Sequence, residues 1–123
     1  MKKLKTIIVD DEAPARQIIS HYLKKMEEIE LCGEAPDGFT ALKMISELKP
    51  DLLFLDIQMP KLTGFEMLEV IPEKPEIIFT TAYDQYAIKA FELNAVDYLM
   101  KPFSEERVRE AVAKAALRIG ERS

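Results

Sequence analysis

Short apolar runs alternate with amphipathic segments along the whole chain, and this alternation restricts the fold more than any other feature of the sequence. We predict five strands, at Leu4–Val9, Ile29–Ala35, Asp51–Leu55, Glu76–Thr80 and Val96–Met100. We predict five helices from apolar residues at helical spacing. Four lie over Ala13–Met26, Phe39–Leu48, Phe65–Ile71 and Asp84–Leu93, and the fifth follows Ser104, with apolar residues recurring from Val108 to Ile119. Strict alternation predicts an α/β domain in which right-handed βαβ units build a parallel sheet with helices on both faces.

Finer patterns predict which side chains are buried. The third run, Leu52–Leu55, is continuously apolar, which is typical of a strand covered on both faces. Asp37 and Ser104 are placed to cap the second and fifth helices. The helical repeats predict core-facing positions, which are Phe39, Leu42, Ile45 and Leu48 on the second helix and Tyr86, Ala90 and Phe91 on the fourth.

Length and composition exclude several classes of protein. A chain of 123 residues suffices for one domain that folds without a metal or a disulfide, and its single cysteine, Cys32, excludes an internal disulfide. The net charge of −5 disfavours direct binding to nucleic acid phosphates. No stretch approaches the ~20 apolar residues of a membrane-spanning helix, and the first apolar run is too short for a signal peptide. We therefore expect a cytoplasmic protein without a membrane partner.

Polar side chains follow four of the five predicted strands. Asp10 and Asp11 follow the first strand, Asp56 the third, Thr80 and Thr81 the fourth, and Lys101 the fifth. The carboxyl ends of parallel strands lie at one edge of a sheet, which is where ligands bind in open α/β folds. We therefore expect these carboxylates, hydroxyls and the amine to meet at that edge.

This set of groups suits phosphate chemistry with a divalent cation. Three crowded carboxylates repel one another, and a hard ion with oxygen ligands, Mg²⁺ above all, relieves that repulsion. A carboxylate beside the ion can attack phosphorus and form an aspartyl phosphate, while an ammonium and a hydroxyl hold the phosphoryl oxygens. Taken singly, each acid also fits a helix cap or a turn, so the prediction depends on their joint placement.

Four motifs in this order resemble those of the receiver domain of two-component response regulators. They are Val9-Asp10-Asp11-Glu12, Leu55-Asp56-Ile57-Gln58-Met59-Pro60, Thr81-Ala82 and Lys101-Pro102-Phe103. The resemblance covers essentially the whole chain, residues 1–123. It implies a flavodoxin-like (CheY-like) three-layer sandwich, with five parallel strands in the order 2-1-3-4-5 and five helices. It also implies a signalling switch that accepts a phosphoryl group from a sensor histidine kinase.

The resemblance further implies the phosphoacceptor and the metal ligands. Asp56 would be the phosphoacceptor. Mg²⁺ would bind directly to Asp11, to Asp56 and to the backbone carbonyl of Gln58, and it would bind Asp10 mainly through a water molecule. The resemblance thus gives each acid of the predicted edge cluster a separate role.

The remaining roles concern the phosphoryl oxygens, the switch and the lifetime of the modification. Thr81 and Lys101 would hold the phosphoryl oxygens, and Thr81 with Tyr98 would form the conformational switch. Gln58 and Tyr83, each two residues after a motif residue, would tune self-dephosphorylation, and we expect the bulky Tyr83 to slow it. The peptide bond between Lys101 and the following proline would be cis.

The segment from Thr81 to Leu99 also resembles receivers of the LytTR (LytR/AlgR-like) subfamily, whose output is normally a C-terminal DNA-binding domain. We expect this chain to be the receiver alone, so that DNA is contacted only through a domain outside it. Phosphorylation would change the face formed by the fourth helix, the fifth strand and the fifth helix. That face would control the output, which in this subfamily is transcription, and would pair two copies as a homodimer. We expect no enzyme activity beyond the domain's own phosphorylation and slow dephosphorylation.

Other functions fit the sequence less well. An aspartyl-phosphate phosphatase would need an Asp-x-Asp motif, but Gln58 stands two residues after Asp56. Flavin binding would need a hydroxyl-rich loop after the first strand, where Asp10 and Asp11 would instead repel a phosphate. The alternative that stays open is a stand-alone or phosphorylation-independent protein-interaction module. Absence of Mg²⁺-dependent phosphorylation would favour that alternative.

Overall fold

A five-stranded parallel sheet forms the middle layer of the protein. The computed structural model describes residues 2–122. Its strands are β1 (Leu4–Val9), β2 (Ile29–Ala35), β3 (Leu52–Asp56), β4 (Glu76–Thr81) and β5 (Asp97–Met100). Neighbouring strands are parallel and follow the order β2-β1-β3-β4-β5. This confirms the parallel sheet and the strand order expected from the sequence.

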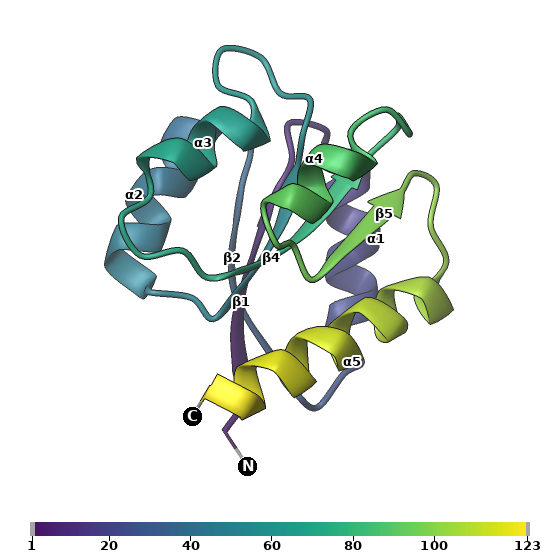
Figure 1. Cartoon of the computed structure of the whole chain (residues 1–123). Coiled ribbons are helices and arrows are strands. Elements are labelled where there is room, and N and C mark those ends of the chain that lie inside the picture. The colour runs from purple at the N-terminus through teal and green to yellow at the C-terminus, as the bar shows by residue number, and fades with distance from the viewer. Residues whose placement is uncertain (1, 123) are drawn as a thin grey trace.

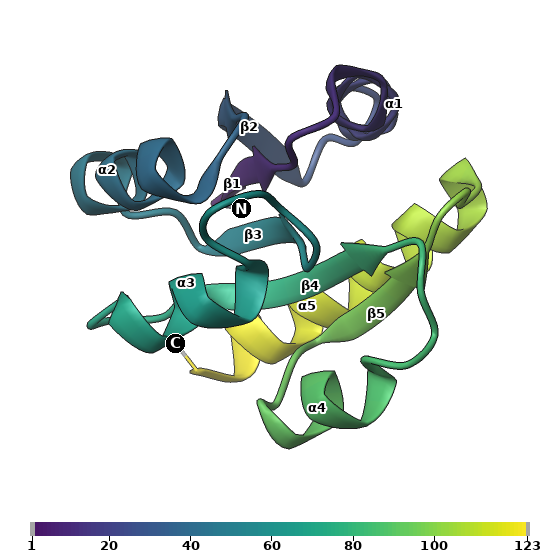
Figure 2. The ribbon, with the colours of Figure 1, turned by 90° about the horizontal axis from the view of Figure 1, so that it is seen from above.

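Five helices cover the two faces of this sheet, as Figure 2 shows. They are α1 (Ala13–Leu23), α2 (Gly38–Leu48), α3 (Gly64–Val70), α4 (Ala87–Glu92) and α5 (Glu105–Arg122). Helices α1 and α5 share one hydrophobic cluster, and α2, α3 and α4 contribute to the cluster on the opposite face. The described part of the chain is therefore the expected three-layer sandwich. None of its helices has the length and apolar character required to cross a membrane.

The central strand β3 supplies both hydrophobic clusters. Its residues Leu52 and Phe54 belong to the cluster beneath α1 and α5, and Leu53 and Leu55 belong to the cluster beneath α2, α3 and α4. All four side chains are fully buried. Side chains alternate across a strand, so a strand covered on both faces needs an unbroken apolar run. The continuous run in the sequence therefore predicted its burial correctly.

Both predicted helix caps are present. The Asp37 side chain accepts a hydrogen bond from the Thr40 backbone N–H at 2.7 Å, at the start of α2. The Ser104 hydroxyl accepts one from the Arg107 backbone N–H at 3.1 Å, at the start of α5. Each cap satisfies one of the backbone donors that the first turn of a helix leaves without an intrahelical partner. These two helix starts are therefore encoded locally.

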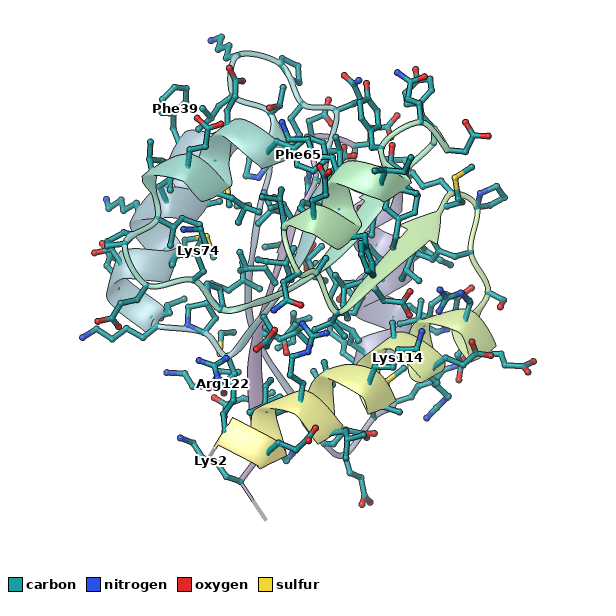
Figure 3. All side chains as sticks on the ribbon, viewed as in Figure 1. Lys2, Phe39, Phe65, Lys74, Lys114 and Arg122 are labelled. Atoms are coloured by element: carbon teal, nitrogen blue, oxygen red, sulfur yellow. The ribbon has the colours of Figure 1, made fainter. Side chains whose placement is uncertain are left out.

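Two aromatic residues that were expected to face the core are instead exposed. Phe91 on α4 is 85% exposed and Phe39 on α2 is 60% exposed, and Figure 3 shows Phe39 pointing away from the sheet. Successive helical residues are rotated by about 100° around the helix axis. When one residue of a helix faces the sheet, the residue next to it in the sequence therefore points away from the sheet. Ala90 occupies the stripe on α4, and Gly38, Ala41 and Ile45 occupy it on α2.

Two helices are also shorter than expected. The first helix ends at Leu23 rather than Met26, although Met26 is still buried. The fourth helix begins at Ala87, so residues 84–86 belong to the loop after β4. That loop lies beside the carboxyl ends of the strands.

Candidate functional site

Three aspartates meet at the carboxyl edge of the sheet, at the top of Figure 1. Asp10 and Asp11 follow β1, and Asp56 is the last residue of β3. One carboxylate oxygen from each lies within 4.8 Å of the other two. Asp10 and Asp56 are buried, whereas Asp11 is exposed. The structure therefore brings together the three acids that the sequence placed at this edge.

Lys101 enters the same cluster from the end of β5. Its Nζ lies 2.9 Å from Asp10 Oδ2 and 3.7 Å from Asp56 Oδ2. It also contacts Glu12 Oε1 at 3.1 Å. Burial lowers the pKa of this ammonium, but the surrounding carboxylates outweigh that effect and raise the pKa above its ordinary value. Lys101 is therefore a fixed positive charge beside the aspartates.

The pKa of Asp56 is strongly displaced. Burial raises it most and the Asp10 charge adds to the effect, while Lys101 opposes both, and the net result is a pKa of about 8. Asp10 Oδ2 is buried, and its partner among the described residues is the Lys101 ammonium at 2.9 Å. A cluster of three carboxylates that shares one ammonium keeps excess negative charge, which suits a hard divalent cation such as Mg²⁺. The residues present thus fit the ion that the sequence predicted.

The end of β4 supplies two buried hydroxyl residues. Thr80 lies opposite Asp56 in the register between β3 and β4, and Thr81 is the next residue. The Thr81 Oγ1 accepts a hydrogen bond from the Tyr83 backbone N–H at 3.2 Å. Thr80 Oγ1 accepts or donates no hydrogen bond within residues 2–122. Both threonines therefore stand at the carboxyl edge of the sheet, and Thr81 is bonded to the loop before α4.

The loop after β3 is packed closely against the Asp56 backbone. The Gln58 backbone N–H donates to Asp56 Oδ1 at 3.3 Å, and the Gly64 N–H donates to the Ile57 carbonyl at 3.0 Å. A Cβ atom added to Gly64 would lie 2.5 Å from the Asp56 backbone oxygen. Only a residue without a side chain permits this approach, so Gly64 helps to position Asp56.

Tyr98 and Tyr83 meet across the gap between β5 and the loop after β4. The half-buried Tyr98 donates its hydroxyl hydrogen to the Tyr83 backbone carbonyl. The Tyr83 side chain is 50% exposed. The Gln58 side chain is bonded not to Tyr83 but to the hydroxyl of Tyr86. Tyr98, the expected switch residue, is therefore connected to the same loop as Thr81. The peptide bond between Lys101 and Pro102 is cis, as expected.

Sequence reasoning missed two residues of this site. Glu12 shares Lys101 with Asp10, although 89 positions separate it from the lysine. Tyr86 reaches Gln58 over 28 positions because residues 82–86 form a loop rather than the first turn of a helix. The acidic run from Asp10 to Glu12, directly after the first predicted strand, could have identified Glu12 as a member of the site. No comparable sequence pattern indicates the path of the loop over residues 82–86, and the contact between Tyr86 and Gln58 depends on that path.

Comparison with known proteins identifies the class. The model of the response regulator receiver domain family matches residues 6–113. The chain therefore belongs to this family, and it is the receiver domain of a two-component response regulator. Receiver domains are signalling domains that bind Mg²⁺ in an acidic pocket and take phosphate from sensor kinases.

Individual relatives place the chain more closely. It is 45% identical over 113 residues to the transcriptional regulatory protein BtsR of Escherichia coli (strain K12), which covers 90% of this chain and 47% of that protein. It is 44% identical over 114 residues to the sensory transduction protein LytT of Bacillus anthracis, with coverage of 90% and 46%. The chain thus spans about half the length of these relatives. Their names are consistent with the LytTR grouping expected from the sequence.

A solved structure supports the same fold. The response regulatory domain of protein mrkE from Klebsiella pneumoniae superposes with a TM-score of 0.86 at 36% sequence identity. The match covers 96% of this chain and 99% of that domain. The sheet order and the arrangement of helices are therefore those of solved receiver domains.

Proposed function

We propose that this domain accepts a phosphoryl group on Asp56 from a sensor histidine kinase and thereby changes the face formed by α4, β5 and α5. The observation that carries the proposal is the cluster at the sheet edge. Three carboxylates lie within 4.8 Å of one another, and Lys101 touches two of them. A nucleophilic carboxylate with a fixed ammonium beside it is suited to phosphoryl transfer, which depends chiefly on positioning and on charge.

The metal would be held by Asp11, by Asp56 and by the Gln58 backbone carbonyl, with Asp10 bound through water. When bound, Mg²⁺ would offset the mutual repulsion of the carboxylates and the charge of the incoming phosphoryl group. Three carboxylates that share one ammonium leave the cluster with excess negative charge, which supports a cation at this place. Asp56 must be ionised to act as a nucleophile, and its raised pKa shows how strongly the cluster needs positive charge.

The transfer step is a substitution at phosphorus. An Asp56 carboxylate oxygen bonds to phosphorus while the P–N bond to a protonated phosphohistidine ring breaks, and the electron pair returns to the ring nitrogen. Lys101, whose Nζ lies 3.7 Å from Asp56 Oδ2, would then hold one phosphoryl oxygen. The Thr81 hydroxyl would hold another. These contacts stabilise the charge that the transfer places on the phosphoryl oxygens.

The signal would leave the site through the loop after β4. Thr81 Oγ1 is bonded to the Tyr83 backbone, and the Tyr83 carbonyl is bonded to Tyr98. A phosphoryl group that draws in the Thr81 hydroxyl would move this loop, and Tyr98 would move with its acceptor. The exposed apolar residues Ile88 and Phe91 on α4 supply a surface that a partner or a second copy could read. Only differential affinity for the two arrangements can shift their populations.

The output is proposed to be transcription in the cytoplasm, through a LytTR-type DNA-binding domain outside this chain. Support comes from the likeness to a transcriptional regulator and from relatives about twice as long. The net charge of −5 argues against DNA binding by this domain itself. Homodimerisation through the face of α4, β5 and α5 is part of the same proposal.

The test is the intact mass of the protein after incubation with acetyl phosphate, with and without Mg²⁺. We expect a gain of one phosphoryl group that requires Mg²⁺ and is lost in Asp56→Asn. Asp51→Asn, immediately before β3 and far from the carboxyl edge of the sheet, is the matched control and should be labelled like the wild type. Labelling of Asp56→Asn at the wild-type rate would refute the assignment. No labelling of the wild type would favour a phosphorylation-independent interaction module.

A further inference from the structure

Tyr86 is the residue immediately before α4. Its backbone carbonyl accepts the first helical hydrogen bond, from the Ala90 N–H at 3.0 Å. The position of Tyr86 is therefore linked to the start of α4. Its side chain is half-buried, unlike those of its neighbours in the loop. A side chain held at the start of α4 can report on the placement of that helix.

The Tyr86 ring lies in a small aromatic cluster. It packs edge-on against Phe65 of α3, with ring centroids 5.8 Å apart, and against Tyr83, at 6.3 Å. Phe65 in turn packs against Phe79 of β4 at 5.1 Å, and Figure 3 shows it between α3 and α4. The Lys89 ammonium lies 5.0 Å from the Phe65 ring centroid. Edge-on aromatic contacts of this kind hold a ring in one orientation.

The hydroxyl of this fixed ring is bonded to Gln58. Gln58 Nε2 donates a hydrogen bond to the Tyr86 oxygen, and the backbone N–H of the same glutamine donates to Asp56 Oδ1 at 3.3 Å. The glutamine side chain therefore begins beside the phosphoacceptor and ends on the residue that starts α4. A free glutamine at this place could reach a water molecule near Asp56, and a glutamine amide is a group that can orient an attacking water.

We propose that Tyr86 is a positioning residue that holds the Gln58 amide away from Asp56 and so prolongs the life of the phosphoryl group. The proposal rests on the proposed phosphorylation of Asp56. In the hydrolysis that it restrains, a water oxygen bonds to phosphorus and the P–O bond to Asp56 breaks. The Asp56 carboxylate keeps the electron pair, and the water protons pass to phosphate and solvent.

This arrangement couples the lifetime of the modification to α4. A partner that displaces the start of α4 would carry Tyr86 with it and release Gln58. The released amide would then assist hydrolysis, so binding at α4 would change how long the signal lasts. Coupling of this kind needs a physical connection between the two places, and the chain from Asp56 through Gln58 to Tyr86 supplies one.

The test compares the loss of phosphoryl mass from four proteins labelled with acetyl phosphate and Mg²⁺ and then freed of the donor. They are the wild type, Tyr86→Phe, Gln58→Ala and the double variant. Phenylalanine keeps the ring packing and removes only the hydroxyl. Since one hydrogen bond is lost, we expect Tyr86→Phe to lose the group roughly threefold to tenfold faster than the wild type. The Tyr86→Phe change should have almost no effect once Gln58 is alanine.

Tyr22→Phe is the matched control, because it removes a tyrosine hydroxyl on α1, at the opposite face of the sheet, without touching the hydrogen bond of Gln58. It should decay at the wild-type rate. An unchanged or slower decay of Tyr86→Phe would overturn the inference, and so would an equal acceleration in the Gln58→Ala background. If the wild type is labelled and only these comparisons fail, the proposed function stands. If the wild type is not labelled at all, both proposals fail.

Discussion

Replacing Asp56 with asparagine should make the metal-free protein more stable. The side chains have the same shape, and asparagine Oδ1 can still accept the hydrogen bond that Asp56 Oδ1 accepts from the Gln58 N–H. The change removes one charge from a cluster in which three carboxylates have oxygens within 4.8 Å of one another. Lys101 keeps its contacts with Asp10 and Glu12. Relief of repulsion should therefore exceed the loss of the longer contact between Lys101 and Asp56.

The magnitude and its pH dependence follow from the pKa of Asp56. Folding raises that pKa from 3.8 to about 8, so the folded state binds a proton more tightly than the unfolded state. The destabilisation by Asp56 is therefore absent below pH 3.8 and grows as the pH rises toward 8. At about 1.4 kcal/mol for each tenfold change in proton affinity, the upper bound, reached at and above pH 8, is about 6 kcal/mol. Since Asp10 shares the repulsion and a contact with Lys101 is lost, we expect a gain of about 1–3 kcal/mol at neutral pH.

Urea denaturation of both proteins at pH 7.5 and at pH 5, in EDTA and in Mg²⁺, measures this difference. The gain from Asp56→Asn should be larger at pH 7.5 than at pH 5. Mg²⁺ should stabilise the wild type, by about 1.4 kcal/mol at ten times the dissociation constant, and narrow the gap. Glu47→Gln, an exposed change of the same charge on α2, should have little effect. A variant that is less stable than the wild type in EDTA at pH 7.5 would refute the argument from repulsion.

Three further predictions test other parts of the structure by denaturation. Asp97→Asn should cost about 1–3 kcal/mol at pH 7. Burial raises the pKa of Asp97, but its two basic partners lower it below 3.8, so this cost should disappear as the pH falls through that lowered value. Phe91→Ser should change stability by less than about 0.5 kcal/mol, whereas Phe79→Ala should cost about 3–5 kcal/mol, because only the second ring is buried. Gly64→Ala should cost about 1–3 kcal/mol, because its Cβ would lie 2.5 Å from the Asp56 carbonyl oxygen, and an equally stable variant would contradict this packing.

The edge of the sheet could be predicted because strand ends are marked locally. The apolar runs before Asp10 and Asp56 end abruptly in charge, and parallel topology then decides that these ends share one edge. The contact between Lys101 and Asp10 follows from the same rule, since β5 and β1 deliver both groups to that edge. Where position depends on strand direction alone, a sequence contains enough information to place a side chain near its partners.

The short fourth helix could not be predicted in the same way. Helical periodicity indicates that one row of side chains faces the sheet, but in so short a helix it does not indicate which row. Phe91 was expected to face the sheet because aromatic residues are usually buried. In the structure the small Ala90 packs inward, and Phe91 is 85% exposed. The contact between Tyr86 and Gln58 was hidden for a related reason, since it depends on a loop path where helix was expected. Unlike α2 and α5, α4 begins without a side-chain cap, so its start is decided by tertiary packing rather than by local preference.

The weak local preference of α4 for its observed position suits this helix to move when Asp56 is phosphorylated, as we propose. The helix has six residues, and Ala90 is the one that it buries, whereas α5 buries Val108, Ala111, Val112 and Ala115 over eighteen residues. Segments with few buried apolar contacts open or shift at the lowest cost in free energy. A displacement that begins at Asp56 and passes through the loop after β4 should therefore be taken up by α4, while α5 stays in place. The element that the sequence specifies least is thus the one best able to change between two arrangements.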